Sequence, residues 1–246
     1  TTQLPEVLVM TLTIDQLLAQ LHANGALPFE EARAIPKGVY NHPEFLNKEQ
    51  ENIFSSEWVC VGRQDSVSKS GDYLSCEIAG EPILVIRDKD SVLRAFSNVC
   101  LHRLSTLKTG QGNCQRVVCP YHGWAYDLTG KLQGAPYMQQ SPAFDKKDYQ
   151  LPEVRLEIWQ GWIYLTLNAD AEPVATKLSS LHDKIHQYDM ENYAETFREE
   201  HVWDTNWKIL AENFMESYHL PVLHRKTVGG HSKVADMDCP AGEPAY

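Results

Sequence analysis

The sequence lacks the features that mark several classes of protein. No run of about 20 apolar residues is present, so no transmembrane helix is expected. The N-terminus has no basic start followed by an apolar core, so no secretory signal is visible. Lys and Arg number 22 against 33 Asp and Glu, a net charge of −11, which argues against nucleic-acid binding. These absences predict a cytoplasmic protein that binds neither membranes nor nucleic acid.

Cofactor loops and disulfides are also scarce. No Gly-x-Gly-x-x-Gly phosphate loop occurs, so NAD(P)H would have to act through a separate protein. The six cysteines of this acidic chain are better interpreted as ligands and buried thiols than as disulfides. Cys60, in an apolar run after Trp58, is predicted to lie in the core. At 246 residues the chain can bury one large core or two smaller ones.

The strongest motif has two halves. Cys100 and His102 are separated by one residue, Cys119 and His122 by two, and 16 residues lie between the halves. Two thiolates and two imidazoles on facing turns suit a 2Fe–2S centre in which the cysteines hold one iron and the histidines the other. A zinc site is the alternative, because two Cys and two His also suit tetrahedral Zn²⁺. Each half mixes one Cys with one His, whereas zinc clips usually repeat one ligand type, so the spacing favours the cluster.

A second constellation follows about a hundred residues later. Glu216 and His219 are three apart and would share one face of a helix predicted over Trp207–His219. His219 and His224 are five apart, which on a straight helix would turn their side chains away from each other. Pro221 lies between them and should kink or end the helix. Such a kink could let both imidazoles converge on one Fe(II), with a carboxylate from elsewhere as the third ligand.

With both motifs present, the chain resembles the large (α) subunit of the Rieske non-haem iron oxygenases, a family of ring-hydroxylating dioxygenases and demethylases. The flanking residues agree with this resemblance, which runs from about Pro36 to the end of the chain. They are Pro120, Gly123, Trp124, Tyr126, Asp127 and Leu128 beside the first motif, and Asn206, Trp207, Lys208, Glu212, Asn213 and Phe214 before the second. Two departures are visible: Leu104 stands where many members have Gly, and Glu216 where many aromatic dioxygenases have Asp. Glu at this position is typical of members that resemble the quaternary-ammonium demethylases.

The resemblance implies an enzyme, a mono- or dioxygenase that uses O2 as co-substrate. Cys100, His102, Cys119 and His122 would bind the 2Fe–2S cluster, and His219 and His224 would bind catalytic Fe(II). Glu216 would link the two centres across neighbouring subunits of a homotrimer, with Asn213 near the iron. An NAD(P)H-dependent flavin reductase, with or without a ferredoxin, would supply electrons. The substrate would be an aromatic compound or an N- or O-methylated small molecule, including quaternary-ammonium compounds.

Two further readings remain open. A Rieske electron-transfer protein without its own oxygenase activity would explain the first motif but leaves Glu216, His219 and His224 without a role. A di-iron carboxylate enzyme is suggested by Glu216-x-x-His219, but such sites need a second Glu-x-x-His on a facing helix. The pair His182 and His186 sits in a charged helical stretch and is interpreted as a solvated face.

The fold class expected is α+β, in three segments. Residues 1–56 form a helical segment and arm that packs with the catalytic domain, and Ile14 to Gly25 have helical spacing. Residues 57–167 form an antiparallel β Rieske domain with turns at Asp88–Asp90 and Thr129–Gly130. Residues 168–246 begin a helix-and-sheet, helix-grip-like catalytic domain, with a strand predicted over Thr196–Trp203.

That catalytic domain is expected to continue beyond Tyr246, because a further sheet and the third iron ligand usually lie well downstream in this family. The carboxylates after His224 are Asp236, Asp238 and Glu243, and none is assigned as the ligand.

Overall fold

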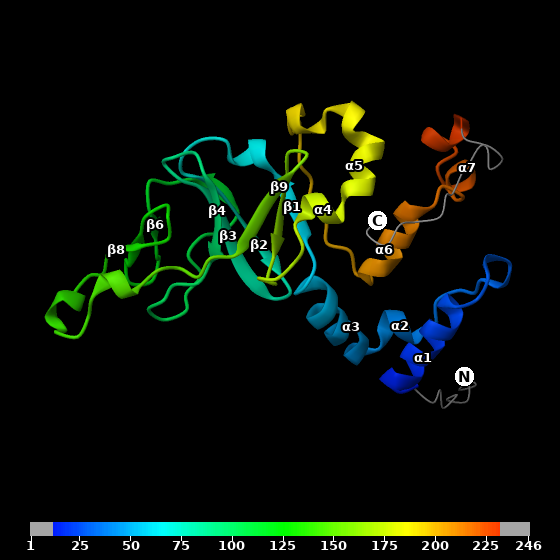
Figure 1. Ribbon diagram of the computed structural model, residues 1–246, viewed down its shortest axis with the longest axis horizontal. Coiled ribbons are helices and arrows are strands. Elements are labelled where there is room, and N and C mark those ends of the chain that lie inside the picture. Colours follow the sequence, from blue (N-terminus) through cyan, green and yellow to red (C-terminus); the bar gives the residue numbers. More distant parts are fainter. Residues whose placement is uncertain (1–11, 232–246) are drawn as a thin grey trace, which may run out of the picture. The chain divides into compact units, whose positions relative to one another are not determined.

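The computed structural model describes residues 12–231, which divide into two compact units (Figure 1). Residues 50–199 form a β-rich unit, and the described residues 12–49 and 200–231 form a helical unit. The N-terminal segment thus belongs to the same unit as the segment that carries the second motif. Within 12–231, no helix has both the length and the apolar character needed to cross a membrane.

Three antiparallel sheets make up the β-rich unit. The first has the order β1-β10-β9, the second β4-β3-β2-β5 and the third β6-β7-β8. The strands are β1 (Val59–Arg63), β2 (Asp72–Ile78), β3 (Glu81–Arg87), β4 (Leu93–Ser97), β5 (Gln111–Asn113), β6 (Val117–Val118), β7 (Ala125–Tyr126), β8 (Leu132–Gly134), β9 (Arg155–Trp159) and β10 (Trp162–Thr166). Figure 1 shows the β6–β8 sheet at one end of this unit and helices α4 and α5 at the other. The predicted antiparallel β domain is confirmed.

Strand β3 separates two hydrophobic cores. Ile83 and Val85 pack with the β1-β10-β9 sheet, and Leu84 and Ile86 face the opposite core, which contains Cys100 among its residues. All four β3 side chains are at most 1% exposed. Because successive side chains of a strand point to opposite faces, a strand buried on both faces reads as a continuous apolar run. The core beyond Leu84 and Ile86 is the one on which the first motif is built.

Both predicted turns are formed and are closed by an aspartate. The carboxylate of Asp88 accepts hydrogen bonds from the backbone of Asp90 and Val92 at 2.9 and 2.8 Å. Asp127 accepts in the same way from the N–H groups of Thr129 and Lys131 at 2.8 and 3.1 Å. An aspartate that binds its own backbone two residues on is a turn-forming device.

Short helices connect and flank the sheets of the β-rich unit. They are the π-helix η2 (Gln50–Phe54), the 3₁₀ turns η3 (Gln64–Val67), η4 (Met138–Gln140), η5 (Lys146–Asp148), η6 (His186–Tyr188) and η7 (Met190–Asn192), and the helices α4 (Val174–Lys177) and α5 (Ser179–Ile185). Cys60, predicted to be buried, lies exposed on β1. Val59 and Val61 pack against the core that holds Ile163 and Leu165, so Cys60 between them points away from that core.

The helical unit contains α1 (Ile14–Gly25), α2 (Gly38–Asn41), α3 (Pro43–Glu49), α6 (Trp207–Met215), α7 (Leu220–Leu223) and the 3₁₀ turns η1 (Phe29–Glu31) and η8 (Val228–His231). Helix α1 matches its prediction and begins with a capping box between Thr13 and Gln16. Leu17 of α1 is 1% exposed and packs against Gly38, where an added Cβ would lie 2.4 Å from a Leu17 methyl carbon.

Two local predictions for residues 196–219 are wrong. The helix predicted to reach His219 ends at Met215, and Thr196–Trp203 forms no strand. An alternating pattern produces a strand only when a neighbouring strand accepts its backbone hydrogen bonds, and no described segment pairs with 196–203.

Candidate metal centres

Two loops bring the halves of the first motif together. In the first loop the N–H of Leu104 donates to the carbonyl of Cys100 at 3.0 Å, and in the second Gly123 donates to Cys119 at 3.1 Å. The residue that closes each turn is left-handed, with φ of 56° at Leu104 and 72° at Gly123. The two loops therefore have one shape, and the first achieves it without the glycine that favours this conformation.

The two cysteines are buried beside each other at the edge of the core. Cys100 and Cys119 are 1% and 3% exposed, and both are free thiols. The hydroxyl of Tyr126 lies 3.5 Å from Cys100 Sγ and accepts a hydrogen bond from the N–H of Leu101 at 3.1 Å. Because this N–H occupies a lone pair of the Tyr126 oxygen, the hydroxyl proton is available to the sulfur.

The surroundings of the two thiols differ. Burial raises the pKa of Cys100. Burial also acts to raise the pKa of Cys119, but backbone N–H groups of Tyr121 and His122 and hydrogen bonds from Cys100 and Ser105 outweigh it and lower the pKa. Donors aimed at a sulfur stabilise the thiolate, the form that binds metal.

The two histidines of the motif, which follow the cysteines in the sequence, lie close to each other. The ring centroids of His102 and His122 are 4.6 Å apart, and the His102 ring stacks on Trp124 at 4.9 Å. Nδ1 of His102 is buried and has no hydrogen-bond partner. A buried polar atom without a partner is costly, and a metal ion bound there would satisfy it.

These four side chains fit a 2Fe–2S cluster. Two neighbouring buried thiols, one orphaned imidazole nitrogen and a second imidazole beside it supply the mixed donor set that such a centre requires. Within residues 12–231, no three or more His, Cys, Asp or Glu side chains are spaced to hold a single ion.

The second constellation lies at the break between α6 and α7. Glu216 follows the last residue of α6 in an extended conformation, with φ −128° and ψ 156°. Its carboxylate accepts the N–H of His219 at 3.2 Å and forms a second hydrogen bond with Nδ1 of the same residue. The contact predicted from one helical face is therefore made by a turn instead.

One helical turn separates the two histidines of this site. His219 precedes α7 and His224 follows it, and their ring centroids are 5.3 Å apart. The prediction that Pro221 kinks or ends the helix is wrong, because Pro221 lies in the first turn of α7, where proline is tolerated. The imidazoles approach each other because the helix breaks before His219.

Glu216 also sets the chemistry of the nearer histidine. The hydrogen bond with the His219 side chain, ahead of bonds from backbone N–H groups, lowers the pKa of Glu216. The carboxylate is thus ionised and receives the proton on Nδ1 of His219, which leaves Nε2 of that ring as the nitrogen free to bind a metal.

A cavity of about 780 Å³ gathers the predicted residues of this site. Asn213, Glu216, His219 and His224 all line it. Phe214, already noted beside the second motif, lines it too. The remaining lining residues, which the sequence did not single out, are Trp203, Thr205, Ile209, Leu210, Ser217, Leu220 and Leu223. Of these residues, only Ile209 could have been predicted from the sequence, because it lies four positions before Asn213 on the same face of the helix. Asp236, Asp238 and Glu243 lie outside the described residues.

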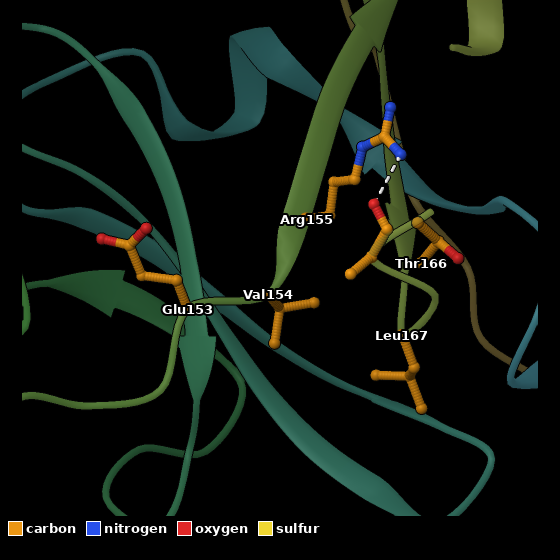
Figure 2. A pocket seen from close by; sticks show the side chains of 6 residues that line it. Glu153, Val154, Arg155, Thr166 and Leu167 are labelled. Atoms are coloured by element: carbon orange, nitrogen blue, oxygen red, sulfur yellow. Dashed lines mark hydrogen bonds between the residues drawn. The ribbon is translucent and has the colours of Figure 1, made fainter. Parts of the chain in front are cut away.

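A different cavity in the β-rich unit contains none of the predicted residues. Figure 2 shows Arg155 in its wall. The Arg155 guanidinium donates to the carbonyl of Ala169 at 3.2 Å. The same guanidinium donates to Glu157 at 2.8 Å and lies 5.0 Å from the Trp58 ring. Because these contacts satisfy the charge of Arg155, we assign this cavity of about 380 Å³ a structural role.

Two family models match the chain. Residues 57–154 match the Rieske [2Fe-2S] domain, and residues 188–237 match the catalytic domain of the ring hydroxylating alpha subunit. Cluster-binding domain and catalytic domain thus follow each other as they do in oxygenase α subunits. The chain belongs to the Rieske non-haem iron oxygenase α subunits, as the motifs indicated. The two matches imply a 2Fe–2S cluster and a mononuclear iron that works with O2.

Several characterised proteins are similar to this chain. The carnitine monooxygenase oxygenase subunit of Escherichia coli K12 is 35% identical over 79% of this chain and 53% of its own length. The glycine betaine monooxygenase oxygenase subunit of Chromohalobacter salexigens is 32% identical over 87% of this chain and 48% of its own. The chain therefore spans about half the length of these relatives.

Solved structures of Rieske oxygenases are also similar to this chain. The quaternary ammonium Rieske monooxygenase CntA in complex with L-carnitine superposes with a TM-score of 0.75 at 30% identity, covering 80% of this chain and 57% of that one. Naphthalene 1,2-dioxygenase with bound indole superposes with a TM-score of 0.69 at 29% identity, covering 78% and 45%.

Proposed function

We propose that the protein is the terminal oxygenase component of a multicomponent monooxygenase that hydroxylates an N-methyl group of a quaternary-ammonium compound. The observation that carries this proposal is the presence of two distinct donor sets on one chain. Cys100 and Cys119 would hold one cluster iron, and His102 and His122 the other. His219 and His224 would hold the catalytic Fe(II), whose third ligand is a carboxylate from another part of the protein.

The second donor set separates an oxygenase from a simple electron carrier. An electron-transfer Rieske protein has no use for the Glu216–His219 pair or for a cavity of about 780 Å³ beside it. When bound, the cluster delivers electrons singly and the Fe(II) activates O2. The chain itself supplies a mostly apolar wall that excludes water, and Glu216 fixes the ring and the tautomer of His219.

The substrate class rests on the cavity and on the relatives. Glu216 is the only charged side chain apart from the histidines among the described residues that line the cavity, and Trp203 and Phe214 add aromatic faces. Such a wall suits a cation better than an anion, because aromatic faces attract quaternary ammonium groups. The similar carnitine and glycine betaine enzymes act on compounds of this kind by their names.

The proposed reaction balances with external electrons. One O2, two electrons and two protons convert an N-methyl group into N–CH2OH and release one water. The C–N bond of that product then breaks, which yields formaldehyde and the demethylated amine. An NAD(P)H-dependent flavin reductase, with or without a ferredoxin, would deliver the electrons. A homotrimer would place Glu216 of one subunit next to the cluster of the next, and cyclic symmetry closes such head-to-tail contacts.

Product analysis tests the substrate class. The full-length protein with its reductase should release formaldehyde from carnitine, glycine betaine or choline, and should not oxidise a panel of aromatic acids. Hydroxylated aromatic products with no formaldehyde from any amine would replace the proposed substrate class by an aromatic one. An active monomer in sedimentation experiments would exclude electron transfer between subunits.

Glu216→Gln tests the role of the carboxylate. The variant should keep both metal centres and a reducible cluster, yet lose nearly all product in a single turnover, because the electron no longer reaches the Fe(II). Glu191→Gln, on the exposed turn η7, is the matched control and should behave as wild type. Near-normal product from the pre-reduced Glu216→Gln protein would show that Glu216 is a bystander.

A further inference from the structure

Helix α6 is attached to the N-terminal helices by a set of polar contacts that we call the α6 clamp: Tyr40, Glu49, Asn206, Lys208 and Glu212. The carboxylate of Glu49 accepts Lys208 Nζ at 2.7 Å and Trp207 Nε1 at 3.1 Å. The hydroxyl of Tyr40 reaches both carboxylate oxygens of Glu212 at 2.8 and 2.9 Å. Partners in these contacts lie more than 150 positions apart in the sequence.

The ion pair of the clamp is buried. The side chains of Lys208 and Glu49 are 12% and 4% exposed. The Lys208 ammonium lies 5.4 to 5.8 Å from the ring centroids of Tyr40, Phe45 and Trp207. Removing two charges from water costs about as much as their attraction returns, so such a pair is weak support for stability. A buried pair does restrict how the two helices pack, because the two charges must meet in one geometry.

The clamp holds α6 at three points along its length. Asn206, which caps the helix through the N–H of Lys208 at 3.0 Å, donates to the carbonyl of Tyr40 at 2.9 Å. Lys208 and Glu212 follow on one helical face, four residues apart. These three points span roughly 9 Å of helix axis, at 1.5 Å per residue. Both the rotation and the axial position of α6 are thereby fixed.

The same helix carries one wall of the iron cavity. Ile209 and Asn213, one residue beyond Lys208 and Glu212, line the cavity, and Glu216 follows the end of α6. A rotation of α6 by about 20° would move a side chain about 5 Å from the axis by roughly 1.7 Å. Metal–ligand distances tolerate only about 0.2 Å. Small errors in the setting of α6 would therefore reach the metal site.

We propose that the α6 clamp is a positioning device for the mononuclear iron site: Glu49, Lys208 and Tyr40 set α6 so that the Glu216–His219 turn presents its imidazole to the metal. This inference rests on the proposed function for the identity of the metal. Glu49, Lys208 and Tyr40 do not line the cavity with His219 and His224, so none of these three residues is expected to touch the iron.

The first test replaces the buried pair as a whole. In the full-length protein, Glu49→Met with Lys208→Met leaves no unpaired charge, and such replacements usually preserve stability. The expected result is an unchanged visible spectrum of the cluster, a thermal midpoint within a few degrees of wild type, and Fe(II) affinity about tenfold lower. The affinity is measured from the nitrosyl EPR signal of the mononuclear Fe(II) during an iron titration, which needs no turnover.

A second variant keeps the test decisive if the double variant does not fold. Tyr40→Phe keeps the ring but removes the hydroxyl that donates to Glu212, and it should also weaken iron binding several-fold with an intact cluster. Glu51→Gln, exposed and two residues beyond Glu49, is the matched control and should bind iron as wild type does.

Each outcome has one meaning. Wild-type iron affinity in either clamp variant, with the cluster spectrum intact, would overturn the positioning role while leaving the proposed function untouched. A wild-type protein that binds no iron at His219 and His224 would instead refute the proposed function.

Discussion

Leu104 occupies a backbone position that glycine would fill with less strain, and this makes a quantitative prediction. Its φ is 56°, close to the 72° of Gly123 at the matching place in the second cluster loop. The left-handed conformation costs an L-residue roughly 1–2 kcal/mol. A glycine would remove that cost but would lose roughly 0.5–1 kcal/mol more backbone entropy on folding.

The side chain of Leu104 offers little compensation, because it is 78% exposed. We therefore expect Leu104→Gly to stabilise the protein by about 0.7 kcal/mol, the difference between the two preceding ranges. For a unit of this size such a gain raises the thermal midpoint by about 2 °C. Gly123→Ala should have the opposite sign and a similar size. An added Cβ there meets only Pro136, at an ordinary 3.6 Å, so backbone strain decides the outcome.

Thermal unfolding followed by cluster absorbance and by far-ultraviolet circular dichroism, at one scan rate, measures both variants. Val92→Gly is the control, because Val92 is 45% exposed and its φ is not positive, so glycine should only destabilise there. If the thermal midpoint of Leu104→Gly falls as that of the control does, the strain argument is refuted. The contacts of the Leu104 side chain would then stabilise the protein by more than the strain costs.

Two further predictions concern the β-rich unit and the ligands. Burial alone would raise the pKa of Asp88, but hydrogen bonds from Arg94 and two backbone N–H groups hold it below its usual range. The stabilisation is therefore complete above the unfolded pKa near 3.9 and lost as the pH falls through the lower folded pKa. Asp88→Asn should cost about 2 kcal/mol at pH 7; denaturant midpoints should show the difference from wild type narrowing only below about pH 4. His102→Cys should change the visible spectrum of the cluster. Cys239 belongs to neither motif, so Cys239→Ser should leave the spectrum unchanged, and equal loss in both variants would contradict the ligand assignment.

Candidate metal ligands could be proposed from the sequence because ligand chemistry depends on residue type and short spacing. Cys100-x-His102 and Cys119-x-x-His122 name their donors without any knowledge of the fold, and the family match over residues 57–154 agrees with that interpretation. The strands around them were predictable for a similar reason, since alternation and aspartate turns act over a few residues.

Other features came only from tertiary contacts. The break of α6 after Met215, the coil at 196–203 and the exposed Cys60 each depend on which distant segment does or does not pack against them. The sequence around Glu49 gave no sign that it binds Lys208, 159 positions away.

The division has a physical cause. Local sequence determined which atoms can bind metal and which way short segments bend, because propensities and turn hydrogen bonds act between neighbours in the chain. Tertiary structure decided burial, and with it the orphaned Nδ1 of His102, the raised pKa of Cys100 and the buried pair on α6. Those properties arise only when segments far apart in sequence exclude water from each other.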